Sequence, residues 1–267
     1  MSRIANSNPS MAMNAGNPLA NSEKQFLQQV ARQRVTTYDG NTWEYYDCGK
    51  QSTGGRNSTV QPPLVCLPGT SGSARCFHLQ MQTLAAKGYR VLARYSAHYP
   101  HRIVSLVMTQ GFCDTSFCGI NVPSVKMLSY MPEFYLKKNI LENFPKESQR
   151  SLACVHAIDY MVDQVDKLSQ KEVASRLTLN CLPCNPNTWT LSLPDEKITV
   201  IDVHNATCCF IISHDETSQP RQVRDQLLAR YPNAKRAMLK NVGDFPFLSH
   251  PDDVAMHLQV HLRAHSV

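Results

Sequence analysis

The serines that come nearest to a nucleophile motif lie in one short loop, residues 69–73 (Gly-Thr-Ser-Gly-Ser). A hydrolytic serine normally stands on a sharp turn with the pattern G-x-S-x-G, and it needs a histidine to take its proton and an acid to orient that histidine. The complete pattern occurs nowhere in the chain, because Ser73 stands where the second glycine is required. Ser71 would therefore be an irregular nucleophile. The simpler interpretation is a tight glycine turn before a helix that Ser73 caps.

This loop lies inside a strand–loop–helix–strand pattern. Pro63–Leu67 is a short, fully apolar run, which is typical of a parallel strand that is covered on both faces. One face of the helix that follows carries Phe77, Met81 and Leu84. Gly88 is expected to end this helix before a second strand at 90–92. Such an order is the βαβ unit of an α/β fold.

A hairpin precedes this unit, and a largely helical half follows it. Arg34–Tyr38 and Thr42–Tyr46 are strand-like runs on either side of Asp39-Gly40, a strong hairpin turn. Residues 112–185 are mainly helical, as expected of an insertion that covers a site. Further strands are predicted at 103–108, 198–201, 208–212 and 236–239, and a last helix from Val254 to Leu262. We expect residues 1–22, rich in Asn, Ser and Ala, to be a disordered tail, and residues 23–267 to form one domain.

Composition and charge exclude two broad classes of protein. Apolar residues make up 42% of the chain and charged residues 18%, which is ordinary for a soluble globular protein. The longest apolar runs are far shorter than the roughly 20 residues of a membrane helix. The net charge is +6, but lysines and arginines are spread along the chain and do not alternate with aromatic residues. We therefore expect no nucleic-acid-binding surface.

Ten cysteines occur in the chain, and its first 22 residues show no secretory signal peptide. This combination predicts a cytosolic protein with reduced thiols. Cys181 and Cys184 have the spacing of half a zinc site, and Cys208-Cys209 offer further thiols. That second pair is adjacent, however, and Cys209 lies in an apolar run. We interpret these residues as unpaired thiols and expect neither a metal nor another cofactor.

Four longer runs resemble the maspardin family, whose members have the α/β-hydrolase fold. They are residues 131–138 (Met-Pro-Glu-Phe-Tyr-Leu-Lys-Lys), 157–163 (Ala-Ile-Asp-Tyr-Met-Val-Asp), 174–181 (Ala-Ser-Arg-Leu-Thr-Leu-Asn-Cys) and 231–237 (Tyr-Pro-Asn-Ala-Lys-Arg-Ala). The resemblance extends from about residue 34 to the end of the chain. It implies an α/β-hydrolase-like fold: a mostly parallel sheet with helices on both faces and a helical insertion. The resemblance further implies a cytosolic protein that associates peripherally with endosomal and trans-Golgi membranes. The implied partners are a receptor cytoplasmic tail and an aldehyde-dehydrogenase-like protein.

The resemblance also assigns positions to the catalytic groups of an active hydrolase. Gly69 and Thr70 correspond to the oxyanion-type loop. Asp215 resembles the triad acid, with Asn205 as the competing match. Asp244 stands where the histidine would be, and a carboxylate with an ordinary pKa of about 3.9 is a weak base at neutral pH. His250 is nearby, but a shift of six residues would aim it elsewhere.

The nucleophile segment itself is the largest departure from the family. It should lie between the strand at 90–92 and the strand at 103–108, but only Ala93–Arg102 stand there, so roughly forty residues are missing. The central strand, its serine and one oxyanion donor would be lost together. The flanking strands must then pair directly, or the sheet must keep a gap. We therefore favour a non-catalytic interaction protein. The alternatives are an ester hydrolase with Ser71 or Ser96 as irregular nucleophile and a defective, truncated isoform.

Overall fold

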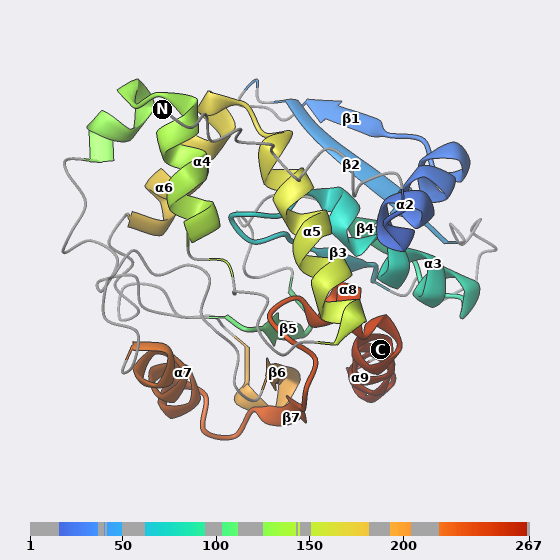
Figure 1. Ribbon diagram of the computed structural model, residues 1–267. Helices are drawn as coiled ribbons and strands as arrows, with labels where there is room; N and C mark the ends of the chain where they lie inside the picture. The colour runs from blue at the N-terminus through green and yellow to red at the C-terminus, as the bar shows by residue number, and fades with distance from the viewer. Residues whose placement is uncertain are drawn as a thin grey trace, which may run out of the picture.

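The computed structural model describes residues 16–36, 40, 42–49, 62–93, 103–111, 125–142, 144, 151–181, 193–203 and 219–265. Within these ranges helices and mostly parallel strands alternate along the chain (Figure 1). The α/β class predicted from the sequence is therefore confirmed.

The N-terminal half builds a four-stranded sheet with the order β1-β2-β4-β3. Its strands are β1 (Gln33–Thr36), β2 (Thr42–Cys48), β3 (Leu64–Cys66) and β4 (Val91–Ala93). β1 and β2 form the predicted antiparallel hairpin, and β3 runs parallel to β4. Gly40 has a φ angle of +80°, which favours glycine at the hairpin turn, whereas residues 37–39 and 41 lie outside the described ranges.

The C-terminal half builds a separate three-stranded sheet with the order β5-β6-β7. All three strands run parallel: β5 (Leu106–Thr109), β6 (Ile198–Val203) and β7 (Lys235–Leu239). These elements confirm three of the predicted strands, while the predicted strand at 208–212 lies outside the described residues.

The sheet is interrupted where the central strand was expected. In Figure 1 the strands follow one another from β1 at the top to β7 at the bottom, with the break between β3 and β5. Among the described residues neither β3 nor β4 pairs with β5, so the predicted direct pairing of the flanking strands does not occur there. Val65 and Leu67 are 45% and 47% exposed, so the expectation that this run is covered on both faces is wrong. The reason is that Val65 and Leu67 alternate with Leu64 and Cys66, which pack into the hydrophobic cluster on one face of the sheet, so they lie on the opposite face.

The described helices cover both faces of the second sheet, as predicted, and one face of the first. On one face lie α2 (Pro18–Gln29), α3 (His78–Ala86) and α9 (Pro251–His265). Their buried side chains form one hydrophobic cluster with residues of both sheets: Phe26, Met81, Leu84, Val91, Ala93, Ile201, Val203, Val254 and Leu258. On the other face, Leu227 of α7 (Gln219–Arg230) packs with Ile198 and Val200 of β6. One apolar layer thus spans both sheets and continues beneath the break.

Ordered structure begins earlier than Glu23, where the sequence had placed its start. Helix α2 begins at Pro18, and the side chain of Asn17 accepts a hydrogen bond from the Leu19 N–H at 2.9 Å. The Asn17 amide also donates to the carbonyl of His156 at 3.0 Å. Phe26 is completely buried, which ties this helix into the core. The predicted tail of residues 1–22 is therefore too long, and residues 1–15 lie outside the description.

A helical layer occupies the predicted insertion. It consists of the 3-10 helix η3 (Val125–Tyr130) and the helices α4 (Glu133–Glu142), α5 (Leu152–Asp166) and α6 (Gln170–Cys181). We call these four elements the cap. Their shared core includes Leu136, Ile140, Tyr160, Met161, Val165 and Leu177. None of the helices in the ranges given above is long and apolar enough to cross a bilayer.

Three further helical elements are short. η1 (Ala74–Phe77) leads from the glycine loop into α3, and α8 (Pro246–Ser249) precedes α9. A further short turn, η4 (Asp195–Lys197), leads into β6. Gly88, with a φ angle of +90°, follows the end of α3 as the sequence predicts.

His261 of α9 is the most strongly perturbed histidine that the structure describes. Its side chain is buried, and its Nδ1 lies 2.7 Å from the hydroxyl of Thr199 on β6. Burial, followed by the charges of His265 and Lys235, lowers the pKa of His261 to about 4. Lys197 also acts on His265, whose pKa is lowered as well, chiefly by burial. Protonation of His261 is therefore unfavourable in the folded state.

The free energy of unfolding should fall as pH drops from 6.5 toward 4. In that window the unfolded chain binds the His261 proton and the folded chain does not, so the slope approaches about 1.4 kcal/mol per pH unit. Urea unfolding at several pH values should show a shallower slope for His261→Gln. His257→Gln, on the same helix, is the matched control and should keep the native slope. Identical slopes in all three chains would contradict this assignment.

Candidate functional site

The glycine loop lies directly after β3, at the carboxyl end of the parallel strand. The Gly72 N–H donates to the Gly69 carbonyl at 3.1 Å, which closes a tight turn. A Cβ atom at Gly72 would lie 3.3 Å from the Pro68 Cβ, so this position has little room for a side chain. Ser73 then caps η1, since its hydroxyl accepts from the Arg75 N–H at 3.3 Å. The predicted roles of the loop glycine and of Ser73 are confirmed.

Two side chains of the cap helix α6 hold this loop. Arg176 Nη1 donates to the Thr70 carbonyl at 3.0 Å and also to the Gly72 carbonyl. Asn180 Nδ2 donates to the Thr70 hydroxyl at 2.7 Å. The carbonyls of Thr70 and Gly72, on either side of Ser71, are therefore turned toward a guanidinium group. The cap fixes the loop by charge-assisted hydrogen bonds rather than by packing alone.

The orientation of these two carbonyls also determines where the neighbouring backbone N–H groups point, and an oxyanion hole requires such donors. In a trans peptide the N–H points opposite to the C=O, so the N–H groups of Ser71 and Ser73 point away from Arg176. The Ser73 N–H already donates to the Cys76 sulfur at 3.3 Å. Oxyanion stabilisation needs preorganised donors aimed at the reacting oxygen. The loop thus commits one of its donors to its own helix cap.

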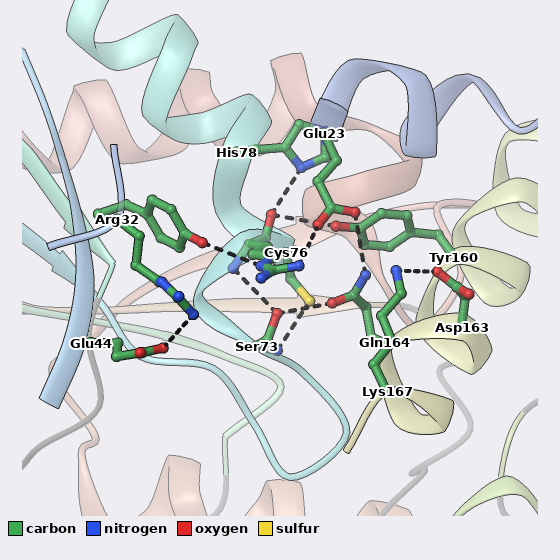
Figure 2. Close-up of polar contacts among 12 residues, drawn as sticks. Glu23, Arg32, Glu44, Ser73, Cys76, His78, Tyr160, Asp163, Gln164 and Lys167 are labelled. Carbon is green, nitrogen blue, oxygen red and sulfur yellow. Dashed lines mark hydrogen bonds and ion pairs between the residues drawn. The ribbon is translucent and has the colours of Figure 1, made fainter. Parts of the chain in front are cut away.

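A polar cluster lies behind the loop and joins four elements (Figure 2). The buried carboxylate of Glu23, on α2, accepts from Gln164 Nε2 of α5 at 3.4 Å and pairs with Arg75 Nη1 at 3.5 Å. The Ser73 hydroxyl donates to Gln164 Oε1 at 2.9 Å. Arg75 Nε in turn donates to the hydroxyl of Tyr46 on β2 at 3.2 Å. These contacts connect the N-terminal helix, the first sheet, the loop and the cap.

Burial shifts the pKa of three groups in and beside this cluster toward the neutral form. Burial raises the pKa of the Cys76 thiol to about 11, and burial also raises the pKa of Tyr160 far above its usual value. Burial lowers the pKa of His78, whose Nδ1 lies 2.9 Å from the Arg75 carbonyl. Cys76 therefore remains a thiol and His78 a neutral imidazole at pH 7. The cluster has the properties of a structural network, not of an activated nucleophile.

The residues predicted for the catalytic positions are only partly within the description. Ser71 is 2% exposed and Asp244 is 4% exposed, so both are buried. Asp244 lies shortly before α8, and α8 packs against η1, the helix that follows the loop. His250 is half-buried at the end of α8, with its Nδ1 3.1 Å from the Ser249 hydroxyl. Asp215, Asn205 and Ser96 lie outside the described residues.

The structure describes no cluster of three metal-ligating side chains in the ranges that it covers. The side chains of Cys181, Cys184, Cys208 and Cys209 lie outside those ranges, so the interpretation of these thiols stays a prediction.

Among the described residues, the most exposed aromatic side chains lie on η3 and α4 of the cap. Tyr130 is 88% exposed and Phe134 is 62% exposed, and Met127 and Tyr135 are about half exposed at 54% and 51%. The rings of Phe134 and Tyr135 lie 4.2 Å apart. We call these four residues the cap aromatic cluster.

Sequence reasoning missed this cluster and the buried Glu23. The sequence did contain a pattern that indicates the cap aromatic cluster. Phe134, Tyr135 and Leu136 are consecutive on one helix, and a helix cannot bury three consecutive side chains on one face. The burial of Glu23 was also indicated by the sequence, since Glu23 lies three residues before Phe26 and shares its helix face.

Comparison with known proteins shows which proteins this chain is similar to. No protein-family model matches it. Maspardin of Danio rerio is 29% identical over an alignment that covers 84% of this chain and 79% of that protein. Maspardin of Homo sapiens is also 29% identical, with 84% and 80% covered. The alignment with the Danio rerio protein spans 268 positions. It includes 84% of the 267 residues of this chain, which is about 224 residues. About forty positions of the alignment are therefore gaps in this chain. That number agrees with the size of the predicted missing segment.

Solved structures with a similar fold are hydrolases. An epoxide hydrolase from Vigna radiata superimposes with a TM-score of 0.58, covering 89% of this chain and 99% of its own at 10% identity. An esterase from Thermogutta terrifontis gives a TM-score of 0.59, covering 88% and 99% at 12% identity. At these identities the similarity shows the α/β-hydrolase-like fold alone.

Replacing Arg176 by methionine should loosen the loop, because the part-buried carbonyls of Thr70 and Gly72 lose a charged donor. Hydrogen bonds to charged groups contribute roughly 1.5–3 kcal/mol, so we expect the free energy of unfolding to fall by about 2 kcal/mol. Lys171→Met, at an exposed position of the same helix, serves as the control and should change it by less than about 0.5 kcal/mol. Denaturant unfolding measures the free energy of unfolding of both variants. Equal losses in the two variants would contradict the stabilising role of the Arg176 hydrogen bonds to the loop.

Proposed function

Since the chain is a maspardin homologue with the α/β-hydrolase-like fold, we propose that it acts without hydrolytic chemistry, as a protein-interaction module. The observation that carries the proposal is the cap aromatic cluster. Exposed apolar side chains gathered on one surface mark interaction sites, and aromatic residues are enriched in the cores of protein interfaces. Phe134 and Tyr135 belong to the run at 131–138, one of the runs that resemble the maspardin family.

The cluster stands on a rigid base. The opposite face of α4 is buried through Leu136 and Ile140, which are 1% and 5% exposed. The amide of Gln170 on α6 donates to the carbonyls of Ser129 and Met131 at 2.8 and 3.1 Å, which fixes the end of η3. A preorganised aromatic surface loses little conformational entropy when it binds a partner.

Charges around the cluster favour a protein partner over a phosphate-rich one. Lys137 pairs with Glu133 at 2.7 Å and also donates to the Asp166 carbonyl. Lys138 pairs with Glu142 at 3.5 Å. Because both lysines of α4 are matched by acidic residues, α4 carries no excess positive charge for phosphate groups. An apolar contact surrounded by balanced charges is typical of protein–protein recognition.

The former catalytic region supports the same proposal. Asp244 stands where the resemblance places the histidine of an active hydrolase, and Ser71 is buried in a loop held by Arg176. Ser73 uses its backbone N–H and its hydroxyl within the fold. The loop is thereby adapted to link the cap to the sheet.

We further propose the partners and location that the maspardin resemblance implies. These are a receptor cytoplasmic tail and an aldehyde-dehydrogenase-like protein, met in the cytosol or peripherally on endosomal and trans-Golgi membranes. The cap aromatic cluster is the surface we assign to the aldehyde-dehydrogenase-like partner, because aromatic side chains are enriched at interfaces between folded proteins.

Short acyl esters such as p-nitrophenyl acetate and butyrate test the absence of hydrolytic chemistry. The purified chain should release p-nitrophenol no faster than Ser71→Ala, and no faster than an unrelated protein at the same concentration. Turnover that disappears in Ser71→Ala or Ser96→Ala would instead establish an irregular hydrolase. Cooperative unfolding of the same sample would exclude a defective, misfolded isoform.

The paired substitution Tyr130→Ser and Phe134→Ser should weaken binding to the aldehyde-dehydrogenase-like protein at least tenfold, since interface aromatic residues often contribute about 2 kcal/mol each. Met256→Ser, on α9, removes a side chain that is similarly exposed at 51% and should leave affinity unchanged. Surface plasmon resonance gives the three affinities. Equal affinity of the unmodified chain and both variants would show that the cap aromatic cluster does not bind this partner.

A further inference from the structure

Two histidines of α9 form a pair that lies against the second sheet. His261 and His265 are four residues apart, and their ring centroids lie 4.7 Å from each other. His261 is only 3% exposed, and His265 is half-buried. The Nδ1 atom of His261 lies 2.7 Å from the hydroxyl of Thr199, the second residue of β6. This contact anchors the histidine pair at the amino end of that strand.

Each ring of the pair has one nitrogen without a partner. The Nε2 atoms of His261 and His265 are buried, and within the described part of the chain neither makes a hydrogen bond. A buried polar atom that lacks a partner costs free energy, so such atoms are rare and call for an explanation. The Thr199 contact uses only the other ring nitrogen of His261. Both Nε2 atoms are therefore available to a ligand.

Two lysines lie beside the histidine pair. Lys235 is the register partner of Thr199 in the parallel strands β6 and β7, so their side chains lie on the same face of the sheet. Lys197 comes two residues before Thr199 in the chain. Burial is the main cause that lowers the pKa of both histidines, but the charge of Lys235 contributes in each case and that of Lys197 contributes at His265. Both ammonium groups therefore act at the rings.

The positive charge of these lysines is not neutralised among the described residues. Both lysines are exposed, and none of the ion pairs in the ranges given above includes either of them. Asp195, on the same turn as Lys197, accepts a hydrogen bond from the Asn233 N–H at 3.3 Å. Arg263, in the last turn of α9, is exposed and adds a further positive charge. We define the histidine–lysine cluster as Lys197, Lys235, His261 and His265.

We propose that the histidine–lysine cluster binds a phosphate dianion, either as a free phosphate monoester or as the head group of a lipid. The two lysines match the charge of a dianion, and its several oxygens accept hydrogen bonds from ammonium and imidazole N–H groups at once. A divalent cation fits less well, because both ammonium groups would repel it. The described residues also offer no group of three metal ligands. This inference is independent of the proposed function, since it concerns α9 and the second sheet rather than the cap.

Inorganic sulfate is the first probe, because it remains a dianion between about pH 5 and 8, where phosphate monoesters titrate. NMR signals of the histidine Cε1–H groups in the full chain report the pKa of each ring. A bound dianion favours the protonated imidazole, so sulfate at about 10 mM should raise the pKa of His265 by roughly one pH unit relative to sodium chloride at equal ionic strength. The pKa of His261 should rise as well. The shift of both signals should saturate as sulfate is added.

Variants of the two lysines test the assignment. The paired substitution Lys197→Gln and Lys235→Gln should lower the affinity for sulfate about tenfold, because the dianion loses both opposite charges. Lys240→Gln, at an exposed position directly after β7, is the matched control and should leave the affinity unchanged. Both lysines of the cluster are exposed, so the substitutions leave the core intact. Thermal unfolding confirms that each variant is folded.

Vesicles distinguish the two sources of the dianion. Phosphatidylcholine vesicles with about 10% phosphatidic acid present a phosphate monoester, whereas vesicles with phosphatidylglycerol present a phosphodiester of single charge. Co-sedimentation with the first kind alone, lost in the lysine double variant, would identify a lipid head group. A sulfate response without co-sedimentation would identify a soluble phosphate monoester.

Three results would overturn the inference. The first is an equal pKa of His265 in sulfate and in chloride. The second is a sulfate response that persists in the lysine double variant. The third is saturable Zn²⁺ binding that His265→Gln removes and the lysine double variant retains, since that would establish a metal site instead. Each of these results leaves partner binding through the cap aromatic cluster untouched, whereas serine-dependent ester turnover would overturn the proposed function and not this site.

Discussion

Backbone hydrogen bonding is the constraint on which the arrangement of this protein depends. A parallel sheet buried between helices must pair its N–H and C=O groups, since each buried unpaired group costs free energy. β4 and β6 satisfy this requirement as interior strands, each with a neighbour on both sides. β3 and β5 satisfy it on one side only within the described chain. The helices tolerate this break, because α3 and α9 pack against each other and cover both sheets with one apolar cluster.

The cap is attached to this frame by polar contacts as well as by its own core. Arg176 joins α6 to the loop after β3, and Gln164 joins α5 to Ser73 and to the buried carboxylate of Glu23. A buried carboxylate is costly unless it is paired and hydrogen-bonded, and Arg75 and Gln164 provide both. Because Arg75 also contacts Tyr46 on β2, the cluster fixes the cap relative to the first sheet. The cap aromatic cluster is thereby held at a defined place on the molecule.

The sequence predicted the elements that depend on local chemistry. Asp39-Gly40 indicated the hairpin, Ser73 the helix cap and Gly88 the end of α3, whereas the predicted loss of the central strand concerns residues 93–102, of which the structure describes only Ala93. What it could not predict depends on contacts between distant segments. The apolar run at β3 is typical of a strand covered on both faces, but Val65 and Leu67 lie on the face opposite the hydrophobic cluster that contains Leu64 and Cys66, and they are exposed there. Asn17-Pro18 was a readable helix start, but the burial of Glu23 depends on Arg75 and Gln164, which lie far away in sequence.

The break between the two sheets also concerns the chemistry that this fold could support. The nucleophile elbow of a hydrolase is the turn that follows its central strand, so a chain without that strand would lose the serine and one oxyanion donor together. Among the described residues no strand lies between β3 and β5. In the loop after β3, Ser71 is buried, and Arg176 binds the carbonyls of the residues on either side of it. The loop that would serve the reaction in a hydrolase therefore holds the cap in place here, and the cap carries the exposed aromatic side chains that we assign to a partner.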